Sequence, residues 1–269
     1  MIDDVSDIIR RVGTVEVLNR WRRLADGDIE EKSPGDLVTI ADRECELALI
    51  PELQAIRDVP VIGEESVASD SRLRDILESL EAAWIVDPVD GTANFAAGKE
   101  DFAVMVALTS GTSTIASWIW HPPTGRMVVA ERGAGAWRDG ERLAAEAPSG
   151  ALAAVIKRKY VPAEVRPALD TIADDLGAGV DKRCAGIEYT DLAEGRTHAY
   201  FFWRTHPWDH APGTLIAEEA GLRVGRLDGS AYDPRDRQRG LLTATPDSWD
   251  SLAERLDQAL APIRSIEPS

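Results

Sequence analysis

One segment of the chain combines residue types that could bind a metal ion and a phosphate group side by side. Residues 84–92 read WIVDPVDGT, an apolar strand-like run that ends in Asp87 and Asp90 and continues into Gly91 and Thr92. Carboxylate oxygens suit Mg²⁺, Mn²⁺ or Ca²⁺, and the free N–H groups at a helix start suit a phosphate. The segment predicts adjoining metal and anion sites, with simple capping of the turn and helix as the alternative.

Two further segments place acids where an element begins or ends. Residues 63–66 (GEES) follow the apolar run 59–62, and residues 208–213 (WDHAPG) set Asp209 at the start of a predicted helix. Each has an ordinary alternative, a solvated loop for Glu64 and Glu65 and helix capping for Asp209. Neither segment alone distinguishes a metal site from these alternatives.

Composition describes a folded chain that repels polyanions. The 269 residues are 44% apolar, which predicts one large or two modest domains. With 30 Lys and Arg against 47 Asp and Glu, the net charge is −17, which disfavours nucleic-acid polymers and anionic membranes as partners. A small anionic substrate would then need local positive charge, which a bound divalent cation supplies.

The cysteines and the N-terminus favour a cytoplasmic protein. Cys45 and Cys184 are too few for a disulfide framework, and acids stand at the start of the chain where a signal peptide carries basic residues. Apolar stretches such as 102–108 are far shorter than the ~20 residues that cross a bilayer, so no transmembrane segment is expected. We assign neither cysteine a catalytic role.

The spacing of apolar residues predicts an α+β first half. Helices are expected over 5–21 and 40–56, the second entered through Thr39 with Asp42 at the spacing of a capping box. Strands are expected at 59–62, 83–86, 102–109, 114–120 and 126–131, with a tight hairpin at Asp139-Gly140. The last three strands predict an antiparallel meander.

The second half alternates strands with helices, which is typical of an α/β layer. We expect a strand at 151–157, a helix at 163–175, a short strand near Cys184 followed by a helix, a strand at 197–203, and helices at 209–220 and 249–260. The change of rhythm sets a domain boundary near 145–150. The predicted domains are 1–147 and 148–269.

Taken in order, these segments resemble the inositol monophosphatase family of metal-dependent, lithium-sensitive phosphatases, in its bacterial form. The resemblance rests on GEES at 63–66, DPVDGT at 87–92, WDHAPG at 208–213 and EAG at 219–221. Lys32, residues 36–39, Asp42 and Glu46 also match the family's N-terminal pattern, so the resemblance covers about residues 5–225. Their joint occurrence favours the metal site over the capping alternatives.

The resemblance implies a layered αβαβα sandwich of the α/β (α+β) class, of the inositol monophosphatase and fructose-1,6-bisphosphatase type. The N-terminal domain would carry the antiparallel sheet and most metal ligands, and the C-terminal α/β domain would contribute Asp209 and the substrate pocket. Two or three Mg²⁺ ions are implied, with Mn²⁺ possible. The implied ligands are Glu64, Asp87 and the carbonyl of Val89 for one ion, and Asp87, Asp90 and Asp209 for another. Glu65 would hold a third ion or only hydrogen-bond its loop.

The resemblance also implies roles in catalysis. Water would be oriented by Glu64 and Thr92, with Thr39 and Asp42 behind them, and would attack phosphorus in line. For Thr39 and Asp42 the capping-box alternative stays open, and both can hold together. The residues expected to contact substrate are Gly91, Thr92, Asp90, Asp209 and Glu188.

The chain departs from the family pattern around the substrate. Phe202 stands where inositol-specific members carry an acid that binds ring hydroxyls, and residues 183–189 (RCAGIEY) replace the usual Gly-Ser/Thr-Ala segment. Glu188, Arg204 and His206 could contact a substrate or serve as surface and packing residues. The metal cage therefore matches the family, while the substrate pocket differs from it.

The predicted function is a Mg²⁺-dependent phosphomonoesterase acting on a small phosphorylated polyol, sugar or related metabolite. The resemblance suggests a homodimer. The alternatives are a 3'-phosphoadenosine 5'-phosphate nucleotidase, for which Phe202 and Trp203 could stack a base, a fructose-1,6-bisphosphatase and a histidinol-phosphate phosphatase. A non-catalytic metal-binding protein is the alternative from a different class.

Overall fold

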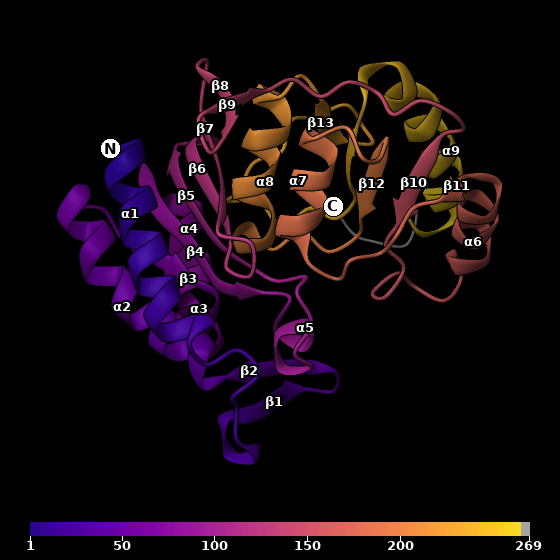
Figure 1. Cartoon of the computed structure of the whole chain (residues 1–269). Helices are drawn as coiled ribbons and strands as arrows, with labels where there is room; N and C mark the ends of the chain where they lie inside the picture. Colours follow the sequence, from indigo (N-terminus) through magenta and orange to yellow (C-terminus); the bar gives the residue numbers. More distant parts are fainter. Residues whose placement is uncertain (265–269) are drawn as a thin grey trace.

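Helices and sheets alternate in layers through the molecule (Figure 1). The computed structural model describes residues 1–264. In order, the layers are helices α1 (Ile2–Gly13) and α2 (Ile40–Ile56), a seven-stranded sheet, helices α7 (Ala185–Ala193) and α8 (Pro207–Glu219), a five-stranded sheet, and helices α6 (Arg166–Asp175) and α9 (Pro246–Arg264). The predicted αβαβα sandwich is confirmed.

The first helical layer follows the apolar periodicity with one difference. Helix α2 has the predicted bounds, and its capping box is present, because Thr39 Oγ1 accepts from the Ala41 N–H while Asp42 Oδ2 accepts from the Thr39 N–H. Helix α1, expected to run to residue 21, ends at Gly13 and continues as a π-helical turn (Thr14–Leu18). There Thr14 Oγ1 donates to the carbonyl of Arg10, a side-chain bond that competes with regular helix geometry.

The seven-stranded sheet contains the predicted meander. Its strands, in spatial order, are β3 (Val61–Gly63), β4 (Ala82–Asp90), β5 (Ala103–Ser110), β6 (Ser113–His121), β7 (Arg126–Glu131), β8 (Gly135–Arg138) and β9 (Glu141–Leu143). Only β3 and β4 pair in parallel, and the other neighbours are antiparallel. The hairpin at Asp139-Gly140 joins β8 to β9, with both residues at positive φ. Short helices α3 (Glu64–Ser69) and α4 (Arg72–Ser79) follow β3.

Strand β4 is longer than the sequence predicts. It was expected at 83–86 but runs to Asp90, and its pairing with β5 shifts register between Asp87 and Asp90. Pro88 lies within this irregular stretch and has no N–H to give to the ladder. The acids that were expected in a loop after the strand are therefore held on its distorted end.

The five-stranded sheet belongs to the second half of the chain. Its spatial order is β11 (Gly177–Ala178), β10 (Ala153–Ile156), β12 (Ala199–Phe202), β14 (Leu241–Ala244) and β13 (Arg223–Arg226). Strands β11, β10 and β12 are parallel neighbours, and β14 pairs antiparallel with β12 and β13. The prediction of a short strand near Cys184 is wrong. Cys184 has extended backbone, but it is the N-cap residue of helix α7. The short strand before α7 is β11.

Separate apolar cores lie on the two faces of the second sheet. Along β12, Tyr200 and Phe202 face the core shared with α7 and α8, while Phe201 faces the core shared with α6 and α9. This alternation is the period-2 rule of a strand. It directs Phe202 toward the interior between the two sheets.

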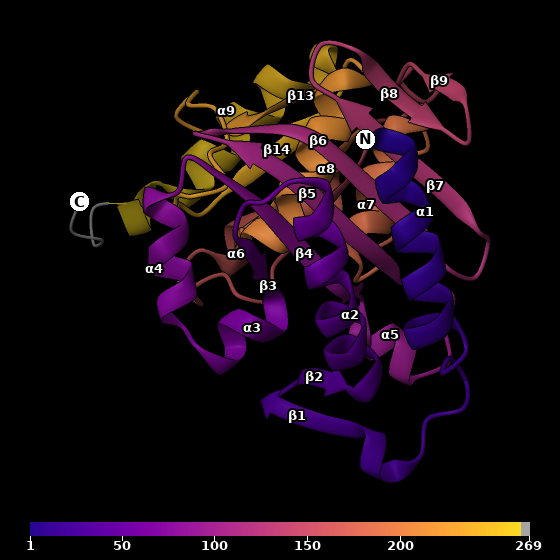
Figure 2. The same ribbon diagram turned by 90° about the vertical axis from the view of Figure 1, so that its left-hand side faces the viewer.

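A small hairpin stands apart from the layers. Strands β1 (Ile29–Ser33) and β2 (Asp36–Thr39) pair with each other and lead into α2, and β2 contacts the short helix α5 (Thr92–Ala96). Figure 2 shows this hairpin beyond the end of the seven-stranded sheet, with α1 and α2 across the sheet's face. The hairpin thereby reaches the end of β4 where Asp87 and Asp90 lie.

The domain division at 147/148 falls in the connection between β9 and β10. Helix α8, from the second half, packs on β4, β5, β6 and β7 of the first half. The division into two domains therefore stays a prediction. Within residues 1–264, no helix is both long and apolar enough to span a membrane.

Close packing of α7 against α8 yields a test of the fold. A Cβ added at Gly213 would lie 2.0 Å from Tyr189 Cδ2, so no side chain fits there without a shift of the buried ring. We expect Gly213→Ala to lower the free energy of unfolding by about 1–3 kcal/mol, as overpacking does. Urea denaturation measures this. Gly27→Ala is the control, because no heavy atom lies within 4 Å of its added Cβ, and equal stability of the two variants would contradict the packing argument.

Candidate active site

A cavity of about 640 Å³ opens where the two sheets and the hairpin meet. The predicted site residues that line it are Glu64, Asp87, Val89, Asp90, Gly91, Thr92, Glu188 and Asp209. Thr39 and Asp42 do not line the cavity and lie behind Thr92. The structure therefore brings the predicted set together around one space.

The acids reach this cavity from separate elements. Glu64 begins α3 directly after β3, whose Gly63 is paired with Val86 of β4, so Glu64 lies beside Asp87. Asp90 ends β4, and Asp209 lies in the first turn of α8. Parallel pairing of β3 with β4 is what aligns the first two acids.

Burial and mutual repulsion make the carboxylates hard to ionise together. Burial raises the pKa of Asp87, which is 1% exposed, well above its usual value, and the charges of Glu64, Asp90 and Asp209 raise it further. Burial raises the pKa of Glu64 to about 8, against the opposing attraction of Lys32, and that of Asp209 to about 7, with Asp90 adding to the effect. A bound cation would relieve this repulsion.

The donor set fits a hard divalent cation. All of these side chains offer carboxylate oxygens, which suit Mg²⁺, Mn²⁺ and Ca²⁺. Among residues 1–264, however, no three His, Cys, Asp or Glu side chains are arranged so that they could already hold one ion. The oxygens are turned to protein donors instead: Glu64 Oε1 accepts from Lys32 Nζ at 2.7 Å, and Asp90 Oδ2 accepts from the Gly186 N–H at 2.6 Å.

Lys32 is the positive charge at this end of the cluster. Its Nζ donates to Glu64 Oε1 and, at 2.9 Å, to Glu65 Oε1. Burial lowers the pKa of Lys32, but the attraction of Glu64 and Glu65 outweighs it and leaves the pKa raised. Glu65, in helix α3, is therefore ion-paired with Lys32 of strand β1.

A hydrogen-bond chain connects Thr39, Asp42 and Thr92. Asp42 Oδ2 accepts from Thr39 Oγ1 at 2.5 Å, and Asp42 Oδ1 accepts from Thr92 Oγ1 at 3.0 Å. The Thr92 hydroxyl also lies 2.9 Å from the carbonyl of Val89, so its single proton serves one of two acceptors at a time. Burial raises the pKa of Asp42 to about 6 despite the bonds from Thr39, which lower it. The capping box and the link to Thr92 thus coexist.

Gly91 makes the turn from β4 into α5. Its φ of +84° lies in the left-handed region, and an added Cβ would lie 2.8 Å from the Asp101 carbonyl oxygen. Helix α5 has five residues, so its dipole is short, and the phosphate site at Gly91 and Thr92 stays a prediction.

Glu188 lines the cavity, but its hydrogen bonds are to donors of the protein itself. It is 1% exposed, and its Oε1 accepts from Lys157 Nζ and from the N–H groups of Lys182 and Arg183 at 3.0 and 3.2 Å. Burial raises its pKa to about 8 against the attraction of Lys157. Its geometry fits a residue that positions the loop before α7, and its predicted contact with substrate stays a prediction.

The cationic side of the cavity was largely missed from sequence. Lys157, Lys159, Tyr160 and Arg183 line it, and of the cations there only Arg204 was considered. The signal was present, since residues 157–160 read KRKY at the end of the predicted strand 151–157 in a chain of net charge −17. Two other residues were weighed with Arg204. Glu188 lines the cavity but is held by Lys157, and His206 does not line it and stacks on Trp208 at a ring-centroid distance of 4.9 Å.

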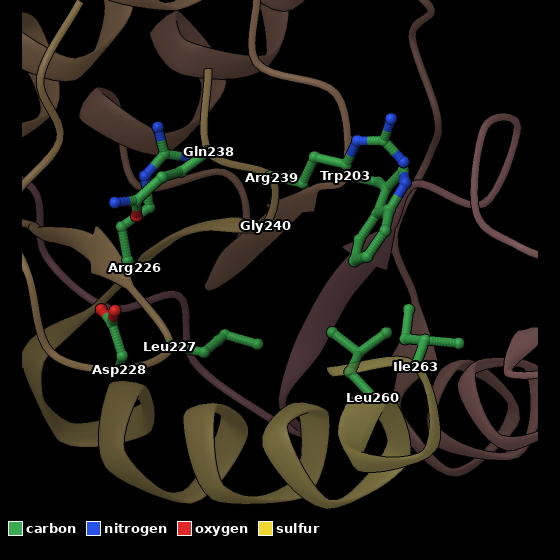
Figure 3. A pocket seen from close by; sticks show the side chains of 9 residues that line it. All are labelled: Trp203, Arg226, Leu227, Asp228, Gln238, Arg239, Gly240, Leu260 and Ile263. Carbon is green, nitrogen blue, oxygen red and sulfur yellow. The ribbon is translucent and has the colours of Figure 1, made fainter. Parts of the chain in front are cut away.

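A second, smaller cavity of about 320 Å³ shares Trp203 with the first. Figure 3 shows its apolar floor of Leu227, Leu260 and Ile263, with Arg226 and Arg239 above. None of the predicted site residues lines it. The chemistry therefore belongs to the larger cavity.

Known proteins resemble this chain in sequence and in fold over most of its length. The "Nus factor SuhB" of Vibrio cholerae is 30% identical over 207 residues, covering 74% of this chain and 75% of that protein. The "Fructose-1,6-bisphosphatase/inositol-1-monophosphatase" of Thermotoga maritima is 26% identical over 242 residues, covering 85% of each. A solved IMPase of Thermotoga maritima superposes with a TM-score of 0.80 at 21% identity, covering 97% of this chain and 98% of that one.

The fold and the carboxylate-lined cavity define a metal-dependent phosphoric monoester hydrolase. The sequence profile of the inositol monophosphatase family matches residues 6–265, and the chain belongs to that family. The predicted family and reaction class are confirmed.

The raised pKa values predict how stability depends on pH and on Mg²⁺. In the unfolded chain these acids titrate near 4, whereas in the folded protein Asp209 and Glu64 titrate near 7 and 8. Between about pH 4 and 8 the metal-free folded protein holds protons that the unfolded chain has released, so its stability falls as pH rises. Mg²⁺ takes the place of these protons, and we expect it to raise Tm by several degrees at pH 8 and by little at pH 5.

Thermal denaturation with Mg²⁺ and with a chelator checks this. Asp87→Asn is expected to lose most of the Mg²⁺ response, while Asp174→Asn, at an exposed position on α6, keeps it. An equal Tm increase at both pH values, or a full response in Asp87→Asn, would contradict the assignment of the cluster to metal binding.

Proposed function

We propose that this protein hydrolyses a small phosphorylated polyol, sugar or related metabolite in the carboxylate-lined cavity, with Mg²⁺ as the ion and Mn²⁺ as a substitute. The observation that carries the proposal is the convergence of Glu64, Asp87, Asp90 and Asp209 on one cavity, where their burial calls for a cation. A volume of about 640 Å³ suits a small-molecule substrate. A homodimeric state and lithium sensitivity, which the family resemblance implies, and a cytoplasmic location, expected from the cysteines and the N-terminal residues, are part of the same proposal.

The residues present divide into two proposed ligand sets. Glu64, Asp87 and the carbonyl of Val89 would hold one ion, and Asp87, Asp90 and Asp209 a second. When bound, such ions polarise phosphoryl oxygens and lower the pKa of water. The bond from Lys32 to Glu65 supports a loop-holding role for Glu65 rather than a third ion.

Thr92 is proposed to orient the attacking water, with Glu64 on the other side of it. When Thr92 Oγ1 donates its proton to Asp42 or to the Val89 carbonyl, its lone pairs are free to accept a proton from water. Asp42, with a pKa of about 6, is mostly ionised at neutral pH and can receive the Thr92 hydrogen bond. Thr39 keeps Asp42 in place through its N–H and hydroxyl.

Aromatic stacking of a nucleotide base gains no support from the cavity wall. Phe202 is 4% exposed and stacks on Tyr189 and Tyr200 at ring-centroid distances of 5.3 and 5.8 Å. Tyr160 is exposed, but Arg204 covers its ring. The polyol and sugar phosphates are therefore favoured over 3'-phosphoadenosine 5'-phosphate. The alternative of a non-catalytic metal-binding protein is disfavoured, because the chain belongs to a family of phosphatases.

Loss of a central ligand tests the reaction. We expect Asp87→Asn to lower Mg²⁺-dependent phosphate release by about 100-fold or more, because an electrostatic contribution to the transition state is removed. Release is measured with Mg²⁺ and with a chelator across inositol phosphates, sugar phosphates and bisphosphates, histidinol phosphate and 3'-phosphoadenosine 5'-phosphate. Asp174→Asn is the control. Undiminished release by Asp87→Asn would contradict the proposed site.

The role of Thr92 has a separate test. Thr92→Val keeps the shape of the side chain but removes the hydroxyl, and kcat is expected to fall by about 100-fold, in the range for a lost proton-transfer or orienting group. Thr92→Ser restores the hydroxyl and should recover most of kcat. Steady-state kinetics at saturating Mg²⁺ distinguish the two variants. A serine variant as slow as the valine variant would assign Thr92 a structural role only.

A further inference from the structure

We propose that the substrate of this cavity carries a second anionic group, a phosphate or a carboxylate apart from the phosphate that is cleaved, and that Arg183, Lys159 and Arg204 bind it. The inference rests on the proposed function, because it assigns the substrate class of that same site. The grounds are topological, electrostatic and conformational.

The topology gathers cations on one side of the cavity. Strands β11, β10 and β12 are parallel neighbours, so their carboxyl ends share one edge of the sheet. Arg183 follows β11, Lys159 follows β10, and Arg204 follows β12. In α/β sheets ligands bind at such an edge. All three cations line the same cavity as the proposed metal-binding acids.

These cations are not neutralised by their surroundings. Lys157, also in the lining, is ion-paired with Asp181 and Glu188. In contrast, neither Lys159, Arg183 nor Arg204 makes an ion pair with any carboxylate in the described part of the chain. In a protein of net charge −17, three neighbouring cations without ion-pair partners mark a place for an anion.

The backbone of Arg183 has a positive φ, a conformation that residues with a Cβ rarely adopt. Its φ is +54°, in the left-handed region, where the Cβ of an L-residue crowds the following carbonyl oxygen. The turn is imposed by Asp181 Oδ1 and Glu188 Oε1, which accept from the Arg183 N–H at 2.9 and 3.2 Å. Glu188 is itself held by Lys157. Strain that is maintained by two specific hydrogen bonds, one of them to the buried Glu188, points to a functional side chain, here that of Arg183, which is exposed and lines the cavity.

Tyr160 arranges the other two cations. Arg204 Cζ lies 3.7 Å from the centroid of the Tyr160 ring, and Lys159 Nζ lies 5.0 Å from it. Lys159 Nζ also donates to the Gly35 carbonyl at 3.2 Å, at the tip of the β1–β2 hairpin. The phenol ring thus holds both charges at the rim without neutralising either of them.

The same side offers little to the hydroxyl groups of an uncharged ring. Phe202 presents hydrocarbon. Lys157 engages Asp181 Oδ1 and Glu188 Oε1, and Glu188 Oε2 is buried away from the open cavity. Apart from these two acids and the proposed metal ligands, Asp36 is the one acid that the structure places in the lining. Anionic oxygens, which guanidinium and ammonium groups bind through charge-assisted hydrogen bonds, fit this wall better than neutral hydroxyls do.

Matched substrate pairs test the inference. A hexose monophosphate is compared with the bisphosphate of the same hexose, and glycerol 3-phosphate with 3-phosphoglycerate, so that the second anion is a phosphate in one pair and a carboxylate in the other. We expect kcat/KM to be at least about tenfold higher for the doubly anionic member of one or both pairs, the value of one charge-assisted hydrogen bond. The pair that shows the preference identifies the second anion.

Variants then assign the preference to these residues. Glycine accommodates a φ of +54°, so Arg183→Gly is expected to fold, and it should reduce the preference by about tenfold, mainly through KM. Arg204→Gln should reduce it as well. Arg158→Gln is the matched control, since Arg158 belongs to the same basic run but pairs with Asp170 and does not line the cavity. Binding of the doubly anionic ligand to an Asp87→Asn background, measured by calorimetry, gives the same comparison without turnover.

The outcomes separate the two proposals. Hydrolysis of monophosphates with no preference for a second anion, or a preference that Arg183→Gly leaves intact, overturns this inference and leaves the phosphatase assignment standing. Failure of the wild-type protein to hydrolyse any member of either pair counts against the proposed substrates as a whole.

Discussion

The repulsion among buried carboxylates is the constraint on which the rest of this structure depends. Asp87 and Asp90 lie almost out of reach of solvent, and Glu64 and Asp209 share their surroundings. Uncompensated buried charge is costly, so the protein must hold these groups against their own electrostatics. The parallel pairing of β3 with β4, the irregular end of β4 and the packing of α8 against the first sheet together provide that rigidity.

The two halves of the chain are joined at this point by specific bonds. Asp90, on the first sheet, accepts from the Gly186 N–H and from Cys184 Sγ at the start of α7. One turn further along, Glu188 holds the loop that presents Arg183. The beginning of α7 therefore links the carboxylate cluster to the cationic wall, the side of the cavity that carries Lys159, Arg183 and Arg204. A phosphate ester bound between them would contact both ends of one short, well-anchored segment.

Much of the fold could be predicted because its signals are local. The apolar periodicity and the Thr39–Asp42 spacing gave the bounds of α2, and alternation with turn residues gave the meander. The irregular end of β4 could not be predicted in this way, since it depends on pairing with β5 around Pro88. Cys184 was misplaced for a similar reason: extended backbone is a local property, but a strand requires a partner.

The site divides along the same line. The acids stand in short contiguous motifs, so the sequence and its family resemblance point to Glu64, Asp87, Asp90 and Asp209 directly. The cationic wall comes from three loops that meet only because their strands are parallel neighbours, and Lys159, Arg183 and Arg204 share no sequence motif. The arrangement of Glu188 under Arg183 likewise becomes visible only from the hydrogen bonds.

The most direct test of the central claim is a crystal structure of the protein with Mn²⁺, read by its anomalous scattering. We expect anomalous peaks among the oxygens of Glu64, Asp87, Asp90 and Asp209, with Glu64 turned from Lys32 toward the ion. Crystals in saturating Mn²⁺ with no peak at these carboxylates, and with the bond between Lys32 and Glu64 intact, would contradict it.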